Sequence, residues 1–557
     1  MGVLFKEFNK EKIEQIKTHP YFEGLVDAIL KQADKNVSTE PPRVKFSQIH
    51  LYETTGNREI FQKVHGEYEA RMKNLFLAYI FSEDEKYIEP LSDVIWNICD
   101  MESWSIPAHV SEELDIMRRR QNLDLTSTIL GFRIAEILYY IGDKLPKLVR
   151  KRAEYEVRER VIESYKKYDD KTFWWMDCDN NWASVCIGAV FCAFAYLATK
   201  EEIDEYLPRM LKTADGYLRG FEEDGCCKEG YAYWHYGFSY FCLFASMVRD
   251  YTDGEIDYFK NPKVHQIALF QQNAAINDRE LISFSDAGRY FSPGTWLSHF
   301  LKNEYPDIEI PPLKCQKNVS GGLRYMFWMR PELENCSMNP KSHIYHDNQW
   351  FIHRSNAYNF ACKAGHNAEP HNHNDVGSFI ISKNGKVTFT DPGVGEYTRQ
   401  YFSGERYTLI ACSSRGHSVP IINAQYQVAG NKSSTILTET PTEYAFTFEG
   451  AYNVPTLTSL KREFKCDSDS VKITDTFKFS DKPESIVERF VSLVPMEQTD
   501  SGIKCGESVL VFDKDACDVT FSSEGLMRKG HIEETVYIAD ITLKAPEKEI
   551  TCVFELK

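Results

Sequence analysis

The residue pattern changes at about residue 310, and this change limits the fold more than any other feature of the chain. Before it, segments of helical length place apolar side chains at i, i+3, i+4 and i+7, the period of an amphipathic helix. After it, short β-branched and aromatic runs alternate with glycine, asparagine and aspartate, which is typical of antiparallel strands joined by turns. The sequence therefore predicts a helical half followed by a β half.

The clearest helical segments are 127–141, 183–199 and 236–251. The run 185–197 is apolar on nearly every side, so this helix should be buried between other helices. There is no clean repeat of fixed period. Sequential helices with short connections favour stacked helical hairpins, which either form a bundle or close into a complete or incomplete α/α toroid.

Prolines and a glycine-rich stretch mark the boundary between the halves. We expect a helical domain over 1–310, a linker over 311–322 and an antiparallel β-sandwich over 323–557. The expected strands lie at 325–328, 350–353, 358–361, 446–448, 471–479, 509–512 and 551–554.

Composition narrows the classes of partner. A chain of 557 residues is too long to fold around a single hydrophobic core, so more than one domain is expected. The net charge of −17 argues against nucleic acid, and the lack of a long apolar run argues against a membrane span. The first residues lack a signal-peptide core, so a cytoplasmic protein is expected. The 15 cysteines form no Cys-x-x-Cys pair, which favours reduced thiols. A homo-oligomer stays open.

The densest cluster of reactive side chains is His371-Asn-His373-Asn-Asp375. In an extended segment these three side chains would share one face. The next residues, with Asn384-Gly385 between two β-rich runs, predict a hairpin that delivers Asp391 before a Pro-Gly turn.

His417 follows later in the chain, after Gly416. Two histidines and one carboxylate from three segments are a usual ligand set for zinc with an open fourth position. A two-residue turn would pair Asp391 with Ser378, roughly 16 Å along a straight strand from His373. A shared metal therefore requires the histidine-rich end to bulge or fold back.

Several polar groups of the helical half admit two interpretations. Asp179 or Asn180 is a natural N-cap, and Asn181 then lies at a helix N-terminus, where an anion is favoured. Tyr233 and Tyr236 share a helix face and serve either the core or a site. The polar loop that contains Arg289 and the isolated His109 are more often structural. Arg118-Arg119-Arg120 forms either a solvated helix face or part of a basic groove.

Taken together, these pieces resemble the heparinase II/III-like polysaccharide lyases and the related alginate lyases. The resemblance is carried by Asn180-Asn181-Trp182, Glu229-Gly-Tyr-Ala-Tyr233-Trp-His-Tyr236, His371-x-His373-x-Asp375-x-Gly-Ser-Phe, Asp391-Pro-Gly and Gly416-His417. It implies a multidomain α+β protein, with an N-terminal α/α toroid followed by a C-terminal antiparallel β-sandwich.

The resemblance also implies an activity, the β-elimination of glycans of glycosaminoglycan or alginate type that contain uronic acid. Asn181 matches the asparagine that neutralises the uronate carboxylate, and Tyr233 and His371 match the base and acid. His373, Asp391 and His417 match the ligands of a structural zinc ion. Substrate contacts are expected from Trp182, Glu229, Tyr236, Arg289 and His109, with Tyr236 as the fallback for Tyr233.

Tyr233 as a base would need a lowered pKa, for which Arg289 is a hypothetical source of positive charge. Two other classes stay open. One is an α/α-toroid glycoside hydrolase using Asp177, Asp179, Asp224 or Glu229 as acid and base. The other is a non-catalytic glycan-binding protein. The acidic net charge favours uronate oligosaccharides over long polymers, and the residues do not identify the uronate.

Overall fold

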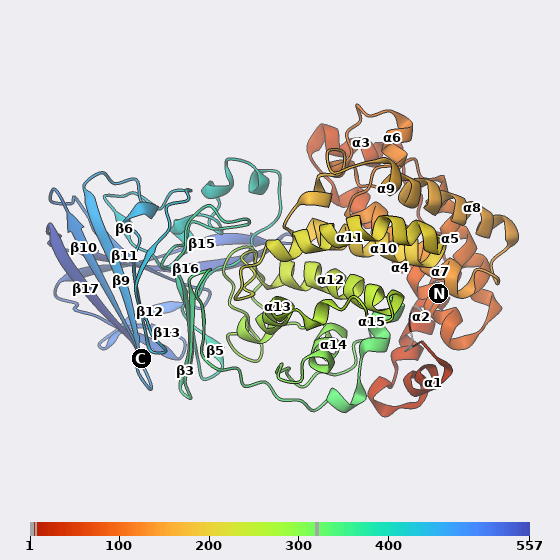
Figure 1. The fold of residues 1–557 in the computed structure, drawn as a ribbon. Coiled ribbons are helices and arrows are strands. Elements are labelled where there is room, and N and C mark those ends of the chain that lie inside the picture. The colour runs from red at the N-terminus through yellow and green to blue at the C-terminus, as the bar shows by residue number, and fades with distance from the viewer. Residues whose placement is uncertain (1–4, 6–7, 318–321) are drawn as a thin grey trace. The chain divides into compact units, whose positions relative to one another are not determined.

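The computed structural model describes residue 5 and residues 8–317 and 322–557. The chain forms two compact units (Figure 1). The first comprises Met1–Gly220, His235–His265 and Pro293–Ser337, and the second comprises Phe221–Trp234, Gln266–Ser292 and Met338–Lys557. Two segments of the helical half thus belong to the unit that contains the sheets. Of the predicted linker, residues 318–321 lie outside the described part of the chain.

The three strongest helix predictions are confirmed as α7, α10 and α12, and α12 runs from the second unit into the first. The α-helices are α1 Lys10–Thr18, α2 Leu25–Val37, α3 Phe46–Thr55, α4 Glu59–Ser82, α5 Ile88–Asp100, α6 Ile116–Arg120, α7 Leu125–Ile141, α8 Lys147–Val157, α9 Glu163–Lys167, α10 Asn181–Leu197, α11 Lys200–Arg219, α12 Tyr231–Tyr251, α13 Pro262–Asn273, α14 Thr295–Glu304 and α15 Leu323–Trp328.

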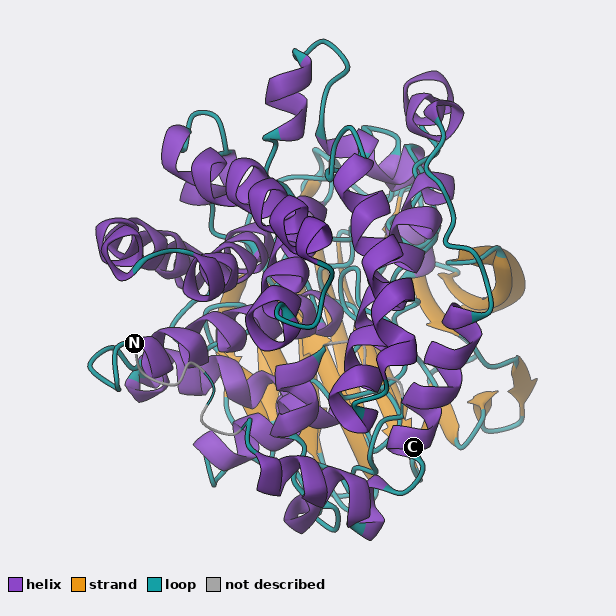
Figure 2. Ribbon diagram, turned by 90° about the vertical axis from the view of Figure 1, so that its right-hand side faces the viewer, coloured by secondary structure: helices purple, strands orange, loops and turns teal. Residues whose placement is uncertain are grey.

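Side-chain caps set where the two central helices of the first unit begin. Asp124 accepts from the backbone N–H groups of Thr126 and Ser127 at the start of α7, and Asn180 accepts from Trp182 N at the start of α10. Each cap satisfies a backbone donor that has no partner within the helix. Helix α10 is buried along most of its length and packs against α7 and α11, as an all-round apolar helix must. Figure 2 shows the helices in purple.

The second unit contains three sheets in which all neighbouring strands are antiparallel. Their strand orders are β1-β2-β3-β4-β5, β12-β13-β14-β17-β10-β9-β8-β7 and β15-β16-β11-β6. The strands are β1 His343–Tyr345, β2 Trp350–Arg354, β3 Tyr358–Lys363, β4 Phe379–Lys383, β5 Lys386–Val387, β6 Ile421–Ile422, β7 Thr435–Glu439, β8 Glu443–Thr447, β9 Leu457–Cys466, β10 Val471–Phe479, β11 Ile486–Ser492, β12 Met496–Thr499, β13 Gly502–Cys505, β14 Ser508–Val511, β15 Cys517–Arg528, β16 Ile532–Leu543 and β17 Glu549–Leu556.

One hydrophobic core joins the three sheets. It takes Phe379 from β4, Phe464 from β9 and Phe490 from β11, and their rings meet at 5.9 and 6.2 Å. Six of the seven predicted strands are confirmed in whole or in part. The strand predicted at 325–328 is wrong, because these residues form helix α15 of the first unit. A short apolar run has the same sequence signature in a buried helix and in a buried strand.

The predicted hairpin is confirmed, and its register contains an irregularity. Asn384 and Gly385 both have positive φ, as a two-residue turn of this kind requires. Ser382 pairs with Val387, but Ile381 then bonds to both Thr388 N and Phe389 O. Two residues therefore oppose one, which bends the second arm as it approaches Asp391.

The arginine triplet is engaged within the first unit. Arg119 is buried and pairs with Glu102 at 2.8 Å, and Arg120 pairs with Glu156 at 2.7 Å. A solvated helix face, one of the two interpretations of the triplet, is therefore wrong for Arg119. All 15 cysteines lie among the described residues as free cysteines. Among the described residues, no helix is both long and apolar enough to cross a membrane.

Candidate catalytic and metal-binding site

The histidine-rich segment is not a strand. It is irregular up to β4, and His371 has a φ of +56°, an uncommon conformation for a residue other than glycine. Tertiary contacts hold it there, since Tyr407 OH donates to Asn372 Oδ1 at 2.9 Å and Arg406 donates to Asn372 O at 3.0 Å. The prediction that His371, His373 and Asp375 share one face of a strand is therefore wrong. The segment folds back instead, as a metal shared by His373 and Asp391 would require.

Asp286 is the centre of this part of the second unit. Its carboxylate is fully buried and receives donors on both oxygens. The donors are His371 Nδ1 (2.8 Å) and Tyr397 OH (3.2 Å) at Oδ2, and His373 Nε2 (3.1 Å), Arg406 Nη2 (2.8 Å) and Tyr401 OH (2.5 Å) at Oδ1. One carboxylate therefore fixes both histidines of the motif.

The charge of Asp286 is stabilised where it lies. Burial alone would raise its pKa, but hydrogen bonds from His371 and His373 and the charge of Arg406 outweigh burial and hold the pKa well below its ordinary value. A buried charge persists only when it is paired and hydrogen-bonded. The donors around Asp286 meet that condition.

Tyr233 lies directly beside His371. Their ring centroids are 4.3 Å apart, and Tyr233 OH shares a 2.8 Å hydrogen bond with Tyr397 OH. The His371 side chain keeps 25% of its surface exposed, whereas Asp286 and His373 are fully buried. With Nδ1–H donated to Asp286, Nε2 of His371 lies on the opposite edge of the ring. The site thus presents a phenol and an imidazole nitrogen together.

The structure corrects the expected electrostatics of Tyr233. Burial raises its pKa, the hydrogen bond to Tyr397 lowers it, and the charge of Asp286 raises it again, so the net shift is upward. The arginine that acts on it is Arg406. Arg289 instead pairs with Glu280 at 2.7 Å and with Glu534 at 3.3 Å. In its resting state Tyr233 therefore carries its proton.

The three predicted metal ligands lie together in the second unit. Side-chain donor atoms of His373, Asp391, His417 and also Asp375 all lie within 4.8 Å of one another, and all four residues are buried. His417 Nδ1 is 2.8 Å from Asp391 Oδ2, and His373 Nδ1 is 4.0 Å from Asp391 Oδ1. Ligand atoms around tetrahedral zinc are about 3.3 Å apart, which lies between these two distances.

The outer contacts of both imidazoles fit a metal. His417 donates Nε2–H to Ala411 O at 3.0 Å, and His373 donates Nε2–H to Asp286. Each ring therefore turns Nδ1 toward Asp391, and His373 Nδ1 is buried without a hydrogen-bond partner. Metal-bound histidines almost always anchor their second nitrogen on a carbonyl or carboxylate in this way.

Asp391 is held by the turn that follows β5. Its Oδ1 accepts from Gly393 N at 2.8 Å, and Ser283 Oγ donates to its backbone oxygen at 2.9 Å. Gly393 has a φ of +66°, and a Cβ there would lie 2.6 Å from Ala287 O. Only glycine fits this close approach, which brings the turn against the loop that carries Asp286.

Asp375 joins the cluster under a different constraint. Lys363 Nζ, itself buried, lies 2.9 Å from Asp375 Oδ1, so this carboxylate is neutralised inside the protein. His371, expected on the same face as His373 and Asp375, is held by Asp286 instead and is not part of the four-residue cluster.

Four of the predicted site residues lie in the first unit, namely His109, Asn181, Trp182 and Tyr236. Asn181 opens α10, and a Cβ added to Gly237 would come within 3.0 Å of Asn181 Cβ, so α12 passes close to it. Trp182 and His109 line one pocket of about 510 Å³, and their ring centroids are 4.7 Å apart. His109 Nδ1 lies 2.8 Å from Asp124 Oδ2.

The remaining predicted residues are less directly placed. Glu229 precedes α12, and its charge raises the pKa of Tyr233. Tyr236 packs against Tyr240, and burial raises its pKa. Of the carboxylates proposed for a hydrolase, Asp224 accepts from the backbone N–H groups of Cys226 and Asp347, which is a structural role.

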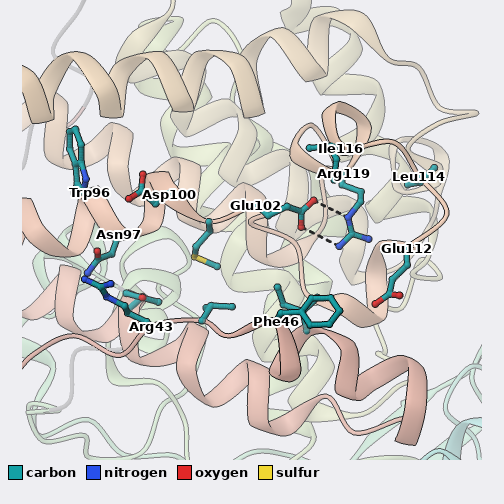
Figure 3. Close-up of a pocket in the computed structure, with 14 residues that line it drawn as sticks. Arg43, Phe46, Trp96, Asn97, Asp100, Glu102, Glu112, Leu114, Ile116 and Arg119 are labelled. Carbon is teal, nitrogen blue, oxygen red and sulfur yellow. Dashed lines mark hydrogen bonds and ion pairs between the residues drawn. The ribbon is translucent and has the colours of Figure 1, made fainter.

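A larger pocket of about 700 Å³ lies elsewhere in the first unit. Figure 3 shows its wall, where the Glu102 carboxylate and the Arg119 guanidinium face each other. Phe46 and Trp96 also line it. None of the predicted catalytic, substrate-binding or metal-binding residues lines this pocket, so its size alone does not make it the candidate site.

Asp286, Tyr397, Tyr401 and Arg406 were not predicted from the sequence. Asp286 lies in a polar Ser-Asp-Ala-Gly loop, a pattern that indicates a turn rather than a partner for two histidines. The other three lie between Asp391 and His417, a segment without α-helix or strand that contains the 3₁₀ turns Gln400–Phe402, Arg406–Thr408 and Ser414–Gly416. These turns are too short for the sequence to show a period that assigns side-chain direction.

Comparison with known proteins agrees with this geometry. Residues 338–556 match the family described as Heparinase II/III-like, C-terminal. The matched residues all lie in the second unit. No protein of curated function matches the sequence.

Solved structures extend the likeness over the whole length of the chain. Heparinase III has a TM-score of 0.64 at 12% identity and covers 98% of this chain and 91% of its own. The heparan sulfate lyase HepC from Pedobacter heparinus has a TM-score of 0.58 at 11% identity, with 100% and 91% covered. The chondroitin AC lyase of Streptomyces coelicolor A3 has a TM-score of 0.57 at 8% identity, with 98% and 81% covered. The predicted resemblance and the predicted fold class are confirmed.

Proposed function

We propose that this protein is a lyase that cleaves uronic-acid-containing glycans by β-elimination. The observation that carries the proposal is the pairing of Tyr233 with His371, whose ring centroids lie 4.3 Å apart, on a scaffold centred on Asp286. A phenol and an imidazole side by side can move two protons in one reaction. The likeness to heparinase III, HepC and chondroitin AC lyase supports the reaction class.

The roles of base and acid follow from the proton positions. His371 donates Nδ1–H to Asp286, so Nε2 offers a lone pair for the C5 proton of the uronate. The electrons of that C–H bond form the C4–C5 double bond, and the C4–O4 bond breaks. Tyr233 starts protonated because its pKa is raised, so it supplies the proton that the departing O4 takes.

Removal of the C5 proton places negative charge on the uronate carboxylate, which must be stabilised first. We assign this to Asn181, whose side-chain amide offers N–H donors in the first turn of α10. The N-terminus of the helix adds a favourable dipole there. Asn181 belongs to the helical unit, and the other two groups belong to the sheet unit.

We propose that His373, Asp391 and His417 hold zinc, since two imidazole nitrogens and a carboxylate are a usual zinc donor set. When bound, the ion would act as a structural centre that neutralises the buried carboxylate of Asp391. The residues themselves perform the positioning, because His373 is tied through Asp286 to His371. The order of the metal cluster is thereby coupled to the orientation of the base.

The test is incubation of the protein with a panel of uronate oligosaccharides. Elimination creates a conjugated double bond that absorbs in the near ultraviolet, whereas hydrolysis creates new reducing ends without it. Tyr233→Phe and His371→Ala should each lower turnover by about 10²–10⁴-fold and leave circular dichroism unchanged. Reducing ends without the absorbance, or full activity in both variants, would reject the proposal.

A further inference from the structure

The pocket that contains Trp182 and His109 has an aromatic wall. Trp174 and Trp182 have ring centroids 4.9 Å apart at 45°, and His109 lies at 61° to the Trp182 ring. The three rings come from two 3₁₀ turns, Pro107–His109 and Trp174–Asp177, and from the start of α10. All of them belong to the first unit.

The wall is accessible to a ligand. Trp174 keeps 53% of its surface exposed, so its ring is open to a ligand. The pocket of about 510 Å³ is in the size range of ligand sites, which combine aromatic walls with a few placed polar groups. A pyranose ring fits such a wall, because its C–H-rich face packs against the electron-rich face of an aromatic ring.

The polar groups of the pocket are preorganised. Asp124 caps α7 and accepts from His109 Nδ1 at 2.8 Å, so the imidazole cannot rotate without losing that bond. Its Nε2 then lies on the opposite edge of the ring. Tyr52 and the exposed Glu53, both from α3, line the pocket as well. These groups are suited to the hydroxyl or amide groups of a sugar.

The charge of the lining selects against anions. Glu53 and Asp124 contribute carboxylates, and among the described lining residues there is no lysine or arginine. Arg118 contacts the lining residue Phe173, but it lies over the ring, 4.8 Å from the centroid, and is not part of the lining. A sulfate or a second uronate carboxylate would lose water here without gaining a cationic partner.

We propose that this pocket is a subsite for an uncharged pyranose, a hexose or N-acetylhexosamine without sulfate, next to the uronate that is cleaved. Trp182 directly follows Asn181 in the first turn of α10, so one helix start serves both sugars. The inference rests on the proposed function and narrows it. The substrate alternates uronate with an uncharged sugar, and a homopolymer of uronates is excluded.

The experiment uses the full chain with three tetrasaccharides, of which the two chondroitins share a backbone. Unsulfated chondroitin, its 6-sulfated form and an alginate oligomer are titrated calorimetrically into Tyr233→Phe protein, and kcat/KM is measured with the wild type. Unsulfated chondroitin should bind at least about tenfold more tightly than the other two. Trp174→Ala should weaken its binding about tenfold. Tyr155→Ala, which removes an exposed aromatic of α8 outside the pocket, should not.

A charge reversal provides the gain-of-function arm. Glu53→Lys should narrow or invert the preference for the unsulfated ligand, because it gives the lining a cationic group. Equal or tighter binding of the sulfated or alginate ligand by the wild-type pocket would overturn the subsite, as would unchanged binding by Trp174→Ala. If no ligand yields the double bond while Trp174→Ala still loses binding, the lyase proposal fails and the subsite stands. If product forms and Trp174→Ala leaves KM unchanged, the subsite fails and the lyase proposal stands.

Discussion

Two buried carboxylates lie on either side of His373 and have opposite surroundings. Asp286 accepts hydrogen bonds from two histidines, two tyrosines and an arginine. Asp391 faces the Nδ1 atoms of His373 and His417, whose Nε2–H groups are committed to Asp286 and Ala411. The first carboxylate has a complete set of donors, and the second shares a centre with two further Lewis bases.

This difference separates positioning from ion binding. Donors on both oxygens neutralise Asp286 and lock its geometry, so it acts by orienting its neighbours. Three electron-pair donors that face one another in a buried, water-free site repel one another unless a proton or a cation lies between them. The Asp391 cluster is therefore suited to a metal, and the Asp286 cluster to holding His371. Four substitutions test this division.

The largest effect is expected from Asp286→Asn. An amide cannot accept from both histidines as a carboxylate does, so His371 loses its fixed tautomer. We expect turnover to fall about 10²–10⁴-fold while KM stays within a few-fold. Metal content should be retained, with affinity about 10–100-fold weaker because an outer contact of His373 is lost. Kinetics and elemental analysis on the same preparation measure both, and wild-type turnover would refute the positioning role.

Asp391→Asn is the matched control, with the same chemical change on the other side of His373. Here the metal affinity should fall by more than about 100-fold, since losing a ligand costs more than losing an outer contact. Tag-free protein should lose its metal in elemental analysis. The variant should also have a lower thermal midpoint of unfolding. Chelator treatment of the wild type should lower its midpoint in the same way. A variant that keeps a full equivalent of metal would show that the ion, if present, uses other ligands.

The sequence predicted the second cluster better than the first. His373, Asp391 and His417 lie in short motifs with their own turn residues, such as Asp391-Pro-Gly393. These motifs could therefore be recognised from the local sequence. The Asp286 cluster depends on contacts between distant segments, from a helical-half loop to an irregular stretch of the β half. Hydrophobic periodicity carries no information on such contacts. The periodicity predicted helices α7 and α10 correctly. It failed at α15, where the apolar run was too short to show a period.

Tyr397→Phe tests the edge of Asp286 that faces His371. The phenol connects Tyr233 to Oδ2 through bonds of 2.8 and 3.2 Å. A hydrogen bond to a charged group is worth about 1.5–3 kcal/mol, so kcat should fall about 10–100-fold without loss of metal. Because Tyr397 is partly exposed, the free energy of unfolding should change little. Equal losses of metal and of activity would show that the Asp286 and Asp391 clusters act as one unit, against the proposed division.

Tyr401→Phe tests the opposite edge, where the phenol donates to Oδ1 at 2.5 Å beside His373 and Arg406. This edge keeps two charged or charge-assisted donors after the substitution, so the orientation of His371 should survive and turnover should stay within about threefold. The lost bond should instead lower the free energy of unfolding by about 1.5–3 kcal/mol, measured by denaturant titration.

Tyr407→Phe is the control in the same loop. Its phenol donates to the neutral amide of Asn372, so its cost should be only about 0.5–1.5 kcal/mol. A larger loss of turnover in Tyr401→Phe than in Tyr397→Phe would reverse the assignment of the two edges, because it would place the orienting contact on the metal side of the carboxylate.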